Sequence, residues 1–367
     1  MRTILSCLLV IPALLASAGP ADARQTAPMR LAIAGLVHGH VGSFLWAAQS
    51  RKDVQIVGIF EANPELLKSY AKQHGFAEDL LFTDLAAMLT KTQPEAVASF
   101  TNTLDHPKVV EAAAARRIHV MMEKPLAVSN ADALRIKRAA EKAGIQVFVN
   151  YETTWYRSHA AMWPMIKERK EFGDIRKMVA MDGHNGPTAI KVQPEFLDWL
   201  RDPVRNGAGA LYDFGCYGAN LMTWMMDNQR PIAVTAITQQ FQPESYPKVD
   251  DEATIVVEYP RAQGIIQASW NWPIGRKDFE VYGERGWAIA TAGNSLRVAQ
   301  PGVSDHPVTL DLLPPDQTTS ISHLIAVARG TVKPNALSSL ENNMIVTEIL
   351  EAARESARTR KRVMLGK

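Results

Sequence analysis

The chain contains little cysteine, almost no net charge and no long hydrophobic run. Cys7 and Cys216 are the two cysteines among 367 residues, which excludes a disulfide-rich scaffold. Forty basic residues balance 38 acidic ones, and the net charge of +2 gives no overall field that would attract nucleic acid or an anionic membrane. Apolar residues make up 47% of the chain and charged residues 21%, as in folded globular proteins. The length suits two domains, and we expect the ligand in a local site.

The N-terminal segment is typical of a secretory signal peptide. Arg2 precedes an apolar run over residues 4–16, and small residues follow up to Ala18 and again up to Ala23. The run is shorter than the roughly 20 residues of a membrane span. We therefore expect residues 1–23 to be removed, with cleavage after Ala18 as an alternative. The mature protein is then periplasmic or secreted and does not bind a membrane. A translation start at Met29 is the competing interpretation.

The predicted signal peptide also limits which disulfides the mature chain can form. Cys7 leaves with the signal peptide, so the mature chain retains Cys216 alone and forms no internal disulfide. Gly215 and Tyr217 flank this thiol, and no histidine is near it in the sequence. We expect Cys216 to be a buried structural residue rather than a nucleophile.

Short β-rich runs alternate with amphipathic helical patterns between Met29 and Asn150. The predicted strands cover residues 31–34, 54–60, 96–100, 119–122 and 146–149, and the predicted helices include residues 64–74, 109–116 and 130–143. Such alternation predicts a parallel sheet covered by helices on both faces. Residues 28–150 are therefore expected to form an α/β domain.

The pattern changes after Asn150. A helix predicted over residues 158–170 is followed by alternating strands, two of which, 254–259 and 264–270, are joined by a short connection as in an antiparallel hairpin. A last helix is predicted over residues 340–358. We expect residues 151–367 to form a second domain on a mainly antiparallel open sheet, with the C-terminal helix included.

A glycine-rich turn follows the first predicted strand. Gly35, Gly39 and Gly42 precede or begin a helix, and such a turn lets the backbone N–H groups and the helix dipole approach a pyrophosphate. The first spacing is four residues instead of two, whereas the second is the usual three. Glu61 ends the next strand, where an acid can bind the ribose hydroxyls and repel a 2'-phosphate. The pattern favours NAD over NADP; a plain α/β domain with a solvated Glu61 is the alternative.

Two histidines in this turn raise the question of a metal. His38 and His40 have the His-x-His spacing that can supply two ligands. No third ligand is near them in the sequence, and both fall where a pyrophosphate is expected. We expect contact with the cofactor and no metal.

Two motifs stand out in the rest of the chain. Glu123-Lys124-Pro125 ends a predicted strand, after Thr101-Asn102 and His106, and Asp213-x-x-x-Tyr217 follows a glycine-rich stretch at residues 206–211. These motifs resemble those of the Gfo/Idh/MocA oxidoreductase family. The resemblance covers nearly all of the mature chain. It implies an N-terminal Rossmann domain, a C-terminal α+β domain whose open sheet mediates a homo-oligomer, and hydride transfer between NAD and a sugar or polyol carbon. Many members carry His where this chain has Tyr217.

The resemblance and the turn together select the expected site residues. The cofactor is expected to contact Gly35, His38, Gly39, His40, Val41, Glu61, Thr101, Asn102, His106, Glu123 and Lys124. The expected catalytic residues are Lys124, Asp213 and Tyr217. Burial should lower the pKa of Lys124 so that the amine exchanges the substrate proton, and its ammonium should stabilise Tyr217 as a phenolate. Asp213 should orient the lysine or the substrate hydroxyl.

Aromatic residues follow the last predicted strand of the first domain. Aromatic faces suit the C–H faces of sugar rings, so Tyr151, Trp155, Tyr156, Arg157 and His184 are the expected substrate contacts. The leading hypothesis is an NAD-dependent oxidoreductase acting on a secondary hydroxyl of a sugar or polyol. An NAD-dependent glycoside hydrolase or lyase that oxidises the sugar transiently is an alternative. A non-catalytic sugar or NAD sensor is an alternative of another class.

Overall fold

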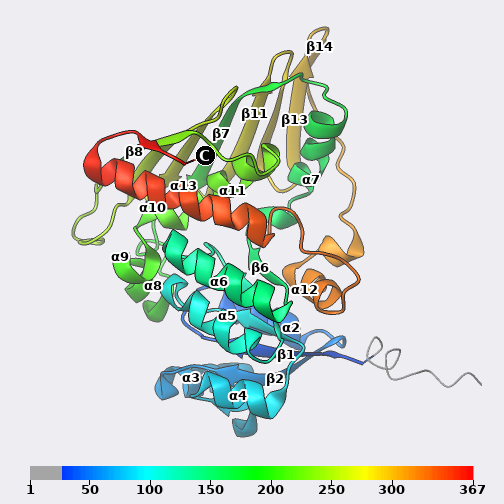
Figure 1. Ribbon diagram of the computed structural model, residues 1–367, viewed down its shortest axis with the longest axis vertical. Coiled ribbons are helices and arrows are strands. Elements are labelled where there is room, and N and C mark those ends of the chain that lie inside the picture. Colours follow the sequence, from blue (N-terminus) through cyan, green and yellow to red (C-terminus); the bar gives the residue numbers. More distant parts are fainter. Residues whose placement is uncertain (1–26, 367) are drawn as a thin grey trace, which may run out of the picture.

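The computed structural model describes residues 27–366, which form two domains stacked end to end (Figure 1). The predicted signal peptide lies outside the described residues and stays a prediction. Within residues 27–366, no helix has both the length and the apolar run needed to cross a bilayer.

The first domain contains a six-stranded parallel sheet in the order β3-β2-β1-β4-β5-β6. Its strands are β1 (Met29–Ala34), β2 (Val54–Phe60), β3 (Leu81–Phe82), β4 (Ala96–Ser99), β5 (His119–Glu123) and β6 (Val147–Asn150). Its helices are α2 (Val41–Gln49), α3 (Pro64–His74), α4 (Leu85–Thr92), α5 (His106–Ala114) and α6 (Asn130–Ala143). Apolar side chains of α2 and α3 pack on one face of the sheet, and those of α4, α5 and α6 pack on the other. The predicted Rossmann architecture is confirmed.

Capping residues explain why two helices begin and end where the sequence predicts. The Asn63 side chain accepts hydrogen bonds from the first turn of α3, Pro64 starts the helix, and Gly75 ends it with φ at 70°. In α6, Ser129 caps the first turn and Gly144 adopts φ 67° after the last one. These local signals act without help from the rest of the chain, so the predicted ranges 64–74 and 130–143 are confirmed.

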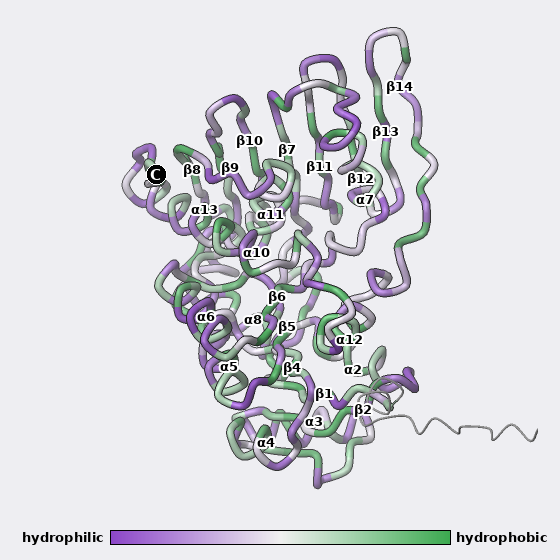
Figure 2. Tube along the Cα trace, turned by 45° about the vertical axis from the view of Figure 1, so that its right-hand side comes forward, coloured by the Kyte–Doolittle hydropathy of each residue, from purple (hydrophilic) through white to green (hydrophobic). Residues whose placement is uncertain are grey.

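The second domain contains a nine-stranded sheet in the order β14-β13-β12-β11-β7-β10-β9-β8-β15. Its strands are β7 (Ile175–Gly183), β8 (Ala233–Gln239), β9 (Glu252–Glu258), β10 (Gln263–Ser269), β11 (Arg276–Gly283), β12 (Trp287–Ala292), β13 (Ser295–Gln300), β14 (Val303–Pro307) and β15 (Val363–Met364). All neighbours are antiparallel except β7 and β10, and β9 and β10 form the predicted hairpin. Figure 2 shows hydrophilic turns at the free end of this sheet.

Seven helices accompany this sheet along the chain within the described residues. They are α7 (Arg157–Trp163), α8 (Pro194–Leu200), α9 (Pro203–Asn206), α10 (Ala210–Asp213), α11 (Gly215–Met225), α12 (Ser320–Ala328) and α13 (Leu340–Thr359). The predicted helix over 158–170 is split, because α7 continues as a π-helical turn, Pro164–Glu168. Pro164 has no N–H to donate to the preceding turn, which widens the helix there.

One helix of the C-terminal half returns to the first domain. Ile321, Leu324 and Val327 of α12 pack in the same apolar cluster as the first strand and α2. The expected domain range of 151–367 is therefore wrong for this segment, whose apolar residues complete the Rossmann core. Figure 1 shows α13 crossing between the two domains, beneath the second sheet.

The turn after β1 requires a glycine at its first position. Gly35 has φ 87°, and its N–H donates to the carbonyl of Phe60 at 2.7 Å. A Cβ at this position would lie 2.6 Å from Thr101 Cγ2. Both the backbone conformation and the close approach of the loop after β4 therefore exclude a side chain.

We predict that Gly35→Ala lowers the free energy of unfolding by about 2 to 4 kcal/mol, through left-handed strain and overpacking. The matched control is Gly75→Ala, because Gly75 also has positive φ but nothing within 4 Å of an added Cβ. Strain alone should cost that variant about 1 kcal/mol. Urea denaturation measures both values, and equal losses would contradict the role given to Thr101.

Candidate active site

An ion pair joins the two domains at the carboxyl ends of the first sheet. Lys124 follows β5, and its Nζ donates to Asp213 Oδ1 at 2.5 Å and to the Asp213 carbonyl at 2.9 Å. Asp213 is the last residue of α10, and both side chains are buried. The motifs that lie 89 positions apart in the sequence therefore meet through one contact.

The second domain holds Asp213 in place from two other directions. Trp270 Nε1 donates to Asp213 Oδ2 at 2.9 Å, and Cys216 Sγ donates to the Asp213 carbonyl at 3.3 Å. Burial raises the pKa of the Cys216 thiol to about 12. The prediction that Cys216 is a buried structural residue is confirmed, because a neutral thiol is a poor nucleophile.

The charge state of Lys124 differs from the sequence expectation. Burial does lower the pKa of its amine, but the Asp213 carboxylate more than offsets this effect, so the pKa is raised above its ordinary value. The pKa of Asp213 is lowered, because the nearby ammonium outweighs its own burial. The expected lowering of the Lys124 pKa is therefore wrong. Lys124 is an ammonium ion, which donates protons rather than accepting them.

Tyr217 lies beside the ion pair, in α11, but not as a phenolate. Its ring centroid is 5.2 Å from Lys124 Nζ and 4.9 Å from Lys277 Nζ, so both cations face the aromatic ring. Burial raises the pKa of Tyr217 well above its ordinary value. The predicted phenolate is therefore wrong, and the hydroxyl stays protonated.

A cavity of about 230 Å³ opens onto this group between the two domains. Its polar lining includes Lys124, Asp213, His184, Gln193 and Lys277, and its aromatic lining consists of Phe196, Phe214 and Tyr217. His184 Nδ1 accepts a hydrogen bond from the Gly186 N–H, and burial lowers the pKa of His184, so the neutral ring carries its proton on Nε2. The cavity thus combines hydrogen-bond donors with aromatic faces.

Several residues of this site had no signal in the sequence. Trp270 is one of eight tryptophans and carries no motif, and Lys277 lies in an ordinary alternating strand. Gln193 and Phe196 come from a segment without periodicity. Their positions depend on how the second sheet faces the first domain, which local patterns do not encode.

The glycine turn is covered by a helix of the second domain. Trp199 Nε1, on α8, donates to the Val37 carbonyl at 3.0 Å, and a Cβ on Gly39 would lie 2.7 Å from the Phe196 ring. The His38 ring centroid lies 4.8 Å from that of Phe196. Gly39, four residues after Gly35, thus makes room for α8, which accounts for the unusual spacing.

Glu61 lies at the end of β2 and organises the same turn. Its Oε2 accepts a hydrogen bond from the Leu36 N–H at 2.8 Å, and its Oε1 accepts one from the Asn63 N–H at 3.0 Å. A carboxylate there still has lone pairs for ribose hydroxyls. The positive φ of Gly35, the start of α2 at Val41 and the acid after β2 together fit a dinucleotide.

The remaining expected cofactor residues each have different neighbours in the structure. Thr101 packs directly against Gly35. Asn102 Nδ2 donates a hydrogen bond to Asp105 Oδ2, and Asn102 Oδ1 accepts one from the Asp105 N–H. His106 is buried and its Nδ1 bonds the Leu126 carbonyl at 3.1 Å, so it supports the segment after Lys124 instead of facing a cavity.

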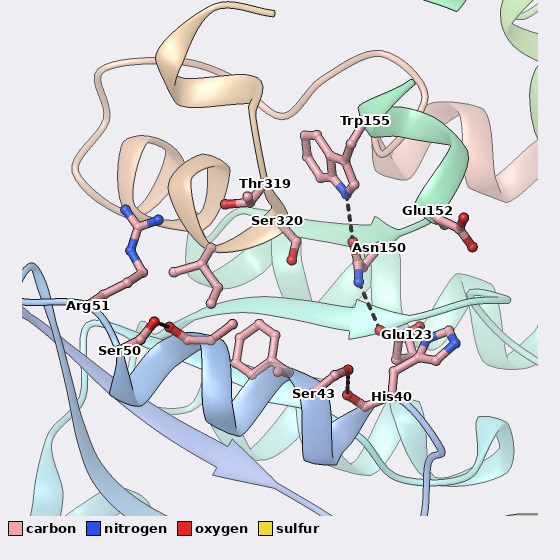
Figure 3. A pocket seen from close by; sticks show the side chains of 13 residues that line it. His40, Ser43, Ser50, Arg51, Glu123, Asn150, Glu152, Trp155, Thr319 and Ser320 are labelled. Atoms are coloured by element: carbon pink, nitrogen blue, oxygen red, sulfur yellow. Dashed lines mark hydrogen bonds and ion pairs between the residues drawn. The ribbon is translucent and has the colours of Figure 1, made fainter. Parts of the chain in front are cut away.

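A hydrogen-bonded chain leads from the glycine turn to the aromatic segment (Figure 3). His40 Nδ1 lies 3.1 Å from Glu123 Oε2, Asn150 Nδ2 donates to Glu123 Oε1 at 2.8 Å, and Trp155 Nε1 donates to Asn150 Oδ1 at 3.1 Å. Although burial opposes it, His40 and His38 hold the pKa of Glu123 at about 2, so it is a carboxylate. These residues line a second cavity of about 560 Å³.

The expected substrate residues after β6 separate into different surroundings. Tyr151 is fully buried and its ring packs edge-on against Tyr217, at 5.5 Å. Tyr156 donates to Glu152, and Arg157 donates to the carbonyls of residues 310 and 311. Neither Tyr156 nor Arg157 lines the cavity at Lys124, and the two bonds of Arg157 hold the outer segment that leads to α12. His184 does line that cavity.

Two family models match the chain, one in each domain. Residues 29–151 match the model described as an oxidoreductase family with an NAD-binding Rossmann fold. Residues 165–289 match the model of the GFO/IDH/MocA C-terminal domain.

Two curated relatives and two solved structures illustrate the range of similar proteins. Trans-1,2-dihydrobenzene-1,2-diol dehydrogenase of Oryctolagus cuniculus is 23% identical over 66% of this chain and 68% of its own length. 1,5-Anhydro-D-fructose reductase of Ensifer adhaerens is 25% identical over 50% of this chain, and the match spans about half of the reductase, 52%. Aldose-aldose oxidoreductase of Caulobacter crescentus, complexed with glycerol, aligns with a TM-score of 0.78 at 20% identity, over 92% of this chain and 100% of the other. An inositol dehydrogenase homolog of Azotobacter vinelandii, complexed with NAD+, aligns with a TM-score of 0.79 at 20% identity, over 93% and 98%.

We predict that Lys124→Met lowers the free energy of unfolding by about 3 to 5 kcal/mol at pH 7, because the Asp213 carboxylate stays buried without its partner. The native pair stabilises the fold above the ordinary carboxyl range near pH 4 and loses this effect as the pH falls through the lowered pKa of Asp213. In the variant, the pKa of Asp213 should rise, so the loss should be smaller at pH 5 than at pH 7.

Urea denaturation at the two pH values measures this difference. Lys167→Met is the control, because Lys167 pairs with the exposed Asp227 far from the site and should cost less than about 1 kcal/mol at either pH. A loss for Lys124→Met that is independent of pH would contradict the paired charges.

Proposed function

The chain belongs to the Gfo/Idh/MocA oxidoreductase family, and we propose that it oxidises a secondary hydroxyl, or reduces the matching carbonyl, of a sugar or cyclic polyol. The observation that carries this proposal is the buried Lys124–Asp213 pair at the wall of a cavity lined by donors and aromatic rings. The named activities of the relatives, on a dihydrodiol and an anhydro sugar, support a substrate with neighbouring oxygens on a ring.

NAD is the cofactor that this fold binds, and the residues of the glycine turn fit it. Gly35 and Val41 would hold the pyrophosphate at the start of α2, and Glu61 would hold the adenosine ribose. When bound, the nicotinamide supplies the group that accepts or donates a hydride. The covering contacts from Phe196 and Trp199 support a tightly held cofactor.

Lys124 moves the proton in this proposal. In the reducing direction its ammonium donates a hydrogen bond, and then a proton, to the carbonyl oxygen of the substrate. In the oxidising direction the neutral amine accepts the hydroxyl proton, so the ammonium must first lose its own. Asp213 sets how much of the amine is protonated, and Trp270 keeps that carboxylate aligned.

The other polar residues of the cavity orient the substrate. His184 Nε2–H and Lys277 Nζ can donate to hydroxyls next to the reacting carbon, and the Tyr217 and Phe214 rings provide faces for ring C–H groups. Tyr217 acts as a neutral phenol and as a platform between two cations. These roles select a compact polyhydroxylated ring over an apolar alcohol.

Replacement of Lys124 tests the proposed function directly. With NAD+ and a panel of sugars and cyclic polyols, Lys124→Met should lower kcat by about 100- to 10,000-fold, because the proton carrier is lost. Binding of NAD+ measured by calorimetry should change little. A variant that retains most of its turnover would contradict the role of Lys124, and a wild-type chain that oxidises none of the panel would contradict the substrate class.

We predict that Asp213→Asn moves the alkaline limb of the pH profile for carbonyl reduction to lower pH. Without the carboxylate, the largest effect that opposes burial is removed, so the pKa of Lys124 falls and the ammonium is lost at a lower pH. Trp270→Phe removes a hydrogen bond to Asp213 but keeps the charge, and its alkaline limb should stay in place. Profiles of kcat/KM against pH distinguish the two variants. An unshifted limb in Asp213→Asn would show that another group donates the proton.

A further inference from the structure

Three potential metal ligands meet between the glycine turn and the end of β5. His38, His40 and Glu123 each offer one ligand atom, and these atoms all lie within 4.8 Å of one another. Glu123 Oε2 is 3.1 Å from His40 Nδ1 and 4.0 Å from His38 Nε2. Glu123 is 83 positions from His40, so sequence spacing alone gave no sign of a third ligand.

One of these ligands is a buried polar atom without a partner. His38 is almost completely buried, and within the described residues its Nε2 has no hydrogen-bond partner. Leaving a buried polar atom unpaired is costly, and native structures usually explain such atoms by a ligand, an ion or water. The unpaired Nε2 lies 4.0 Å from Glu123 Oε2, whereas Asn150 donates to the other carboxylate oxygen, Oε1.

We propose that His38, His40 and Glu123 bind a divalent transition-metal ion of the zinc class. Two imidazoles and one carboxylate are a common ligand set for such ions, with metal–ligand distances of about 2.0 to 2.2 Å. A tetrahedral ion with these bonds separates its ligands by roughly 3.3 Å. Two of the three separations, 3.1 and 4.0 Å, lie on either side of this value, and all three ligand atoms lie within 4.8 Å of one another. This site goes beyond the proposed redox function and revises the expectation that the turn binds no metal.

The surrounding residues show what is fixed and what must move. Asn150 Nδ2 holds Glu123 Oε1, and Trp155 holds Asn150, so the carboxylate presents Oε2 from a supported position (Figure 3). The His40 side chain is 48% exposed and can close on the ion. A metal on His38 Nε2 requires the ring proton to be on His38 Nδ1. The hydrogen bond that His38 Nδ1 accepts from the His40 N–H must therefore break, and it is long, at 3.3 Å.

The bound ion would have at least one open coordination position. His40 lines both the cavity at Lys124 and the second cavity along α2, so the open position faces the space shared by the two. Lys124 follows Glu123 directly, but its charge is neutralised by Asp213. A water molecule or an oxygen of a bound small molecule is the expected fourth ligand.

Metal titration of the full-length chain tests the site without NAD or substrate, so its outcome is independent of the proposed function. Chelator-treated protein should bind one equivalent of Zn²⁺ by calorimetry, and Co²⁺ should give visible absorption bands. His40→Ala and Glu123→Gln should each weaken Zn²⁺ binding by about tenfold or more. His306→Ala, at an exposed histidine of β14, is the control for surface binding and should leave the affinity unchanged.

His40→Ala is the primary variant, since this side chain is half exposed and its loss should leave the far-ultraviolet circular dichroism unchanged. Histidine NMR provides a second readout, because Zn²⁺ should move the His38 proton from Nε2 to Nδ1. Failure of the wild-type chain to bind Zn²⁺ or Co²⁺ would overturn the proposal. Equal binding by wild type and His40→Ala, or loss of binding in His306→Ala alone, would also overturn it.

Discussion

The buried ion pair between Lys124 and Asp213 is the interaction on which the site depends. Two charges removed from water are stable only if each finds its partner and the remaining polar atoms are bonded. Here Trp270 and Cys216 complete the bonding of Asp213, and the backbone after β5 places the lysine. Because the partners come from different domains, the pair is also one of the contacts that hold the second domain against the first.

Burial keeps the groups next to this pair neutral. Both cations lie over the Tyr217 ring, and burial keeps its phenol neutral in this strongly charged site. His184 remains neutral through burial, although it is close to Asp213. The ammonium groups of Lys124 and Lys277 therefore both line the cavity, beside neutral donors, and Lys124 can change its protonation during turnover while the neutral donors keep their hydrogen bonds.

Sequence patterns predicted what local forces decide. Periodicity predicts the parallel sheet and the helices α3 and α6. The family resemblance, and not spacing, predicts that the Lys124 and Asp213 motifs share one site. The protonation states were not predicted correctly, because the pKa of Lys124 depends on a partner 89 positions away and that of Tyr217 on its burial. Trp270, Lys277 and Phe196 were missed for the same reason. Gly39 was interpreted as a phosphate-binding glycine, whereas its neighbour in the structure is Phe196.

The return of α12 to the first domain affects how this architecture can be divided. The chain leaves the Rossmann sheet after β6, comes back with Ile321, Leu324 and Val327, and leaves again into α13. A gene fragment that ends after β6 would encode a sheet with one face stripped of these three side chains. The two halves are thus one folding unit, and exchanging the C-terminal half between relatives would require that α12 be retained with its original sheet.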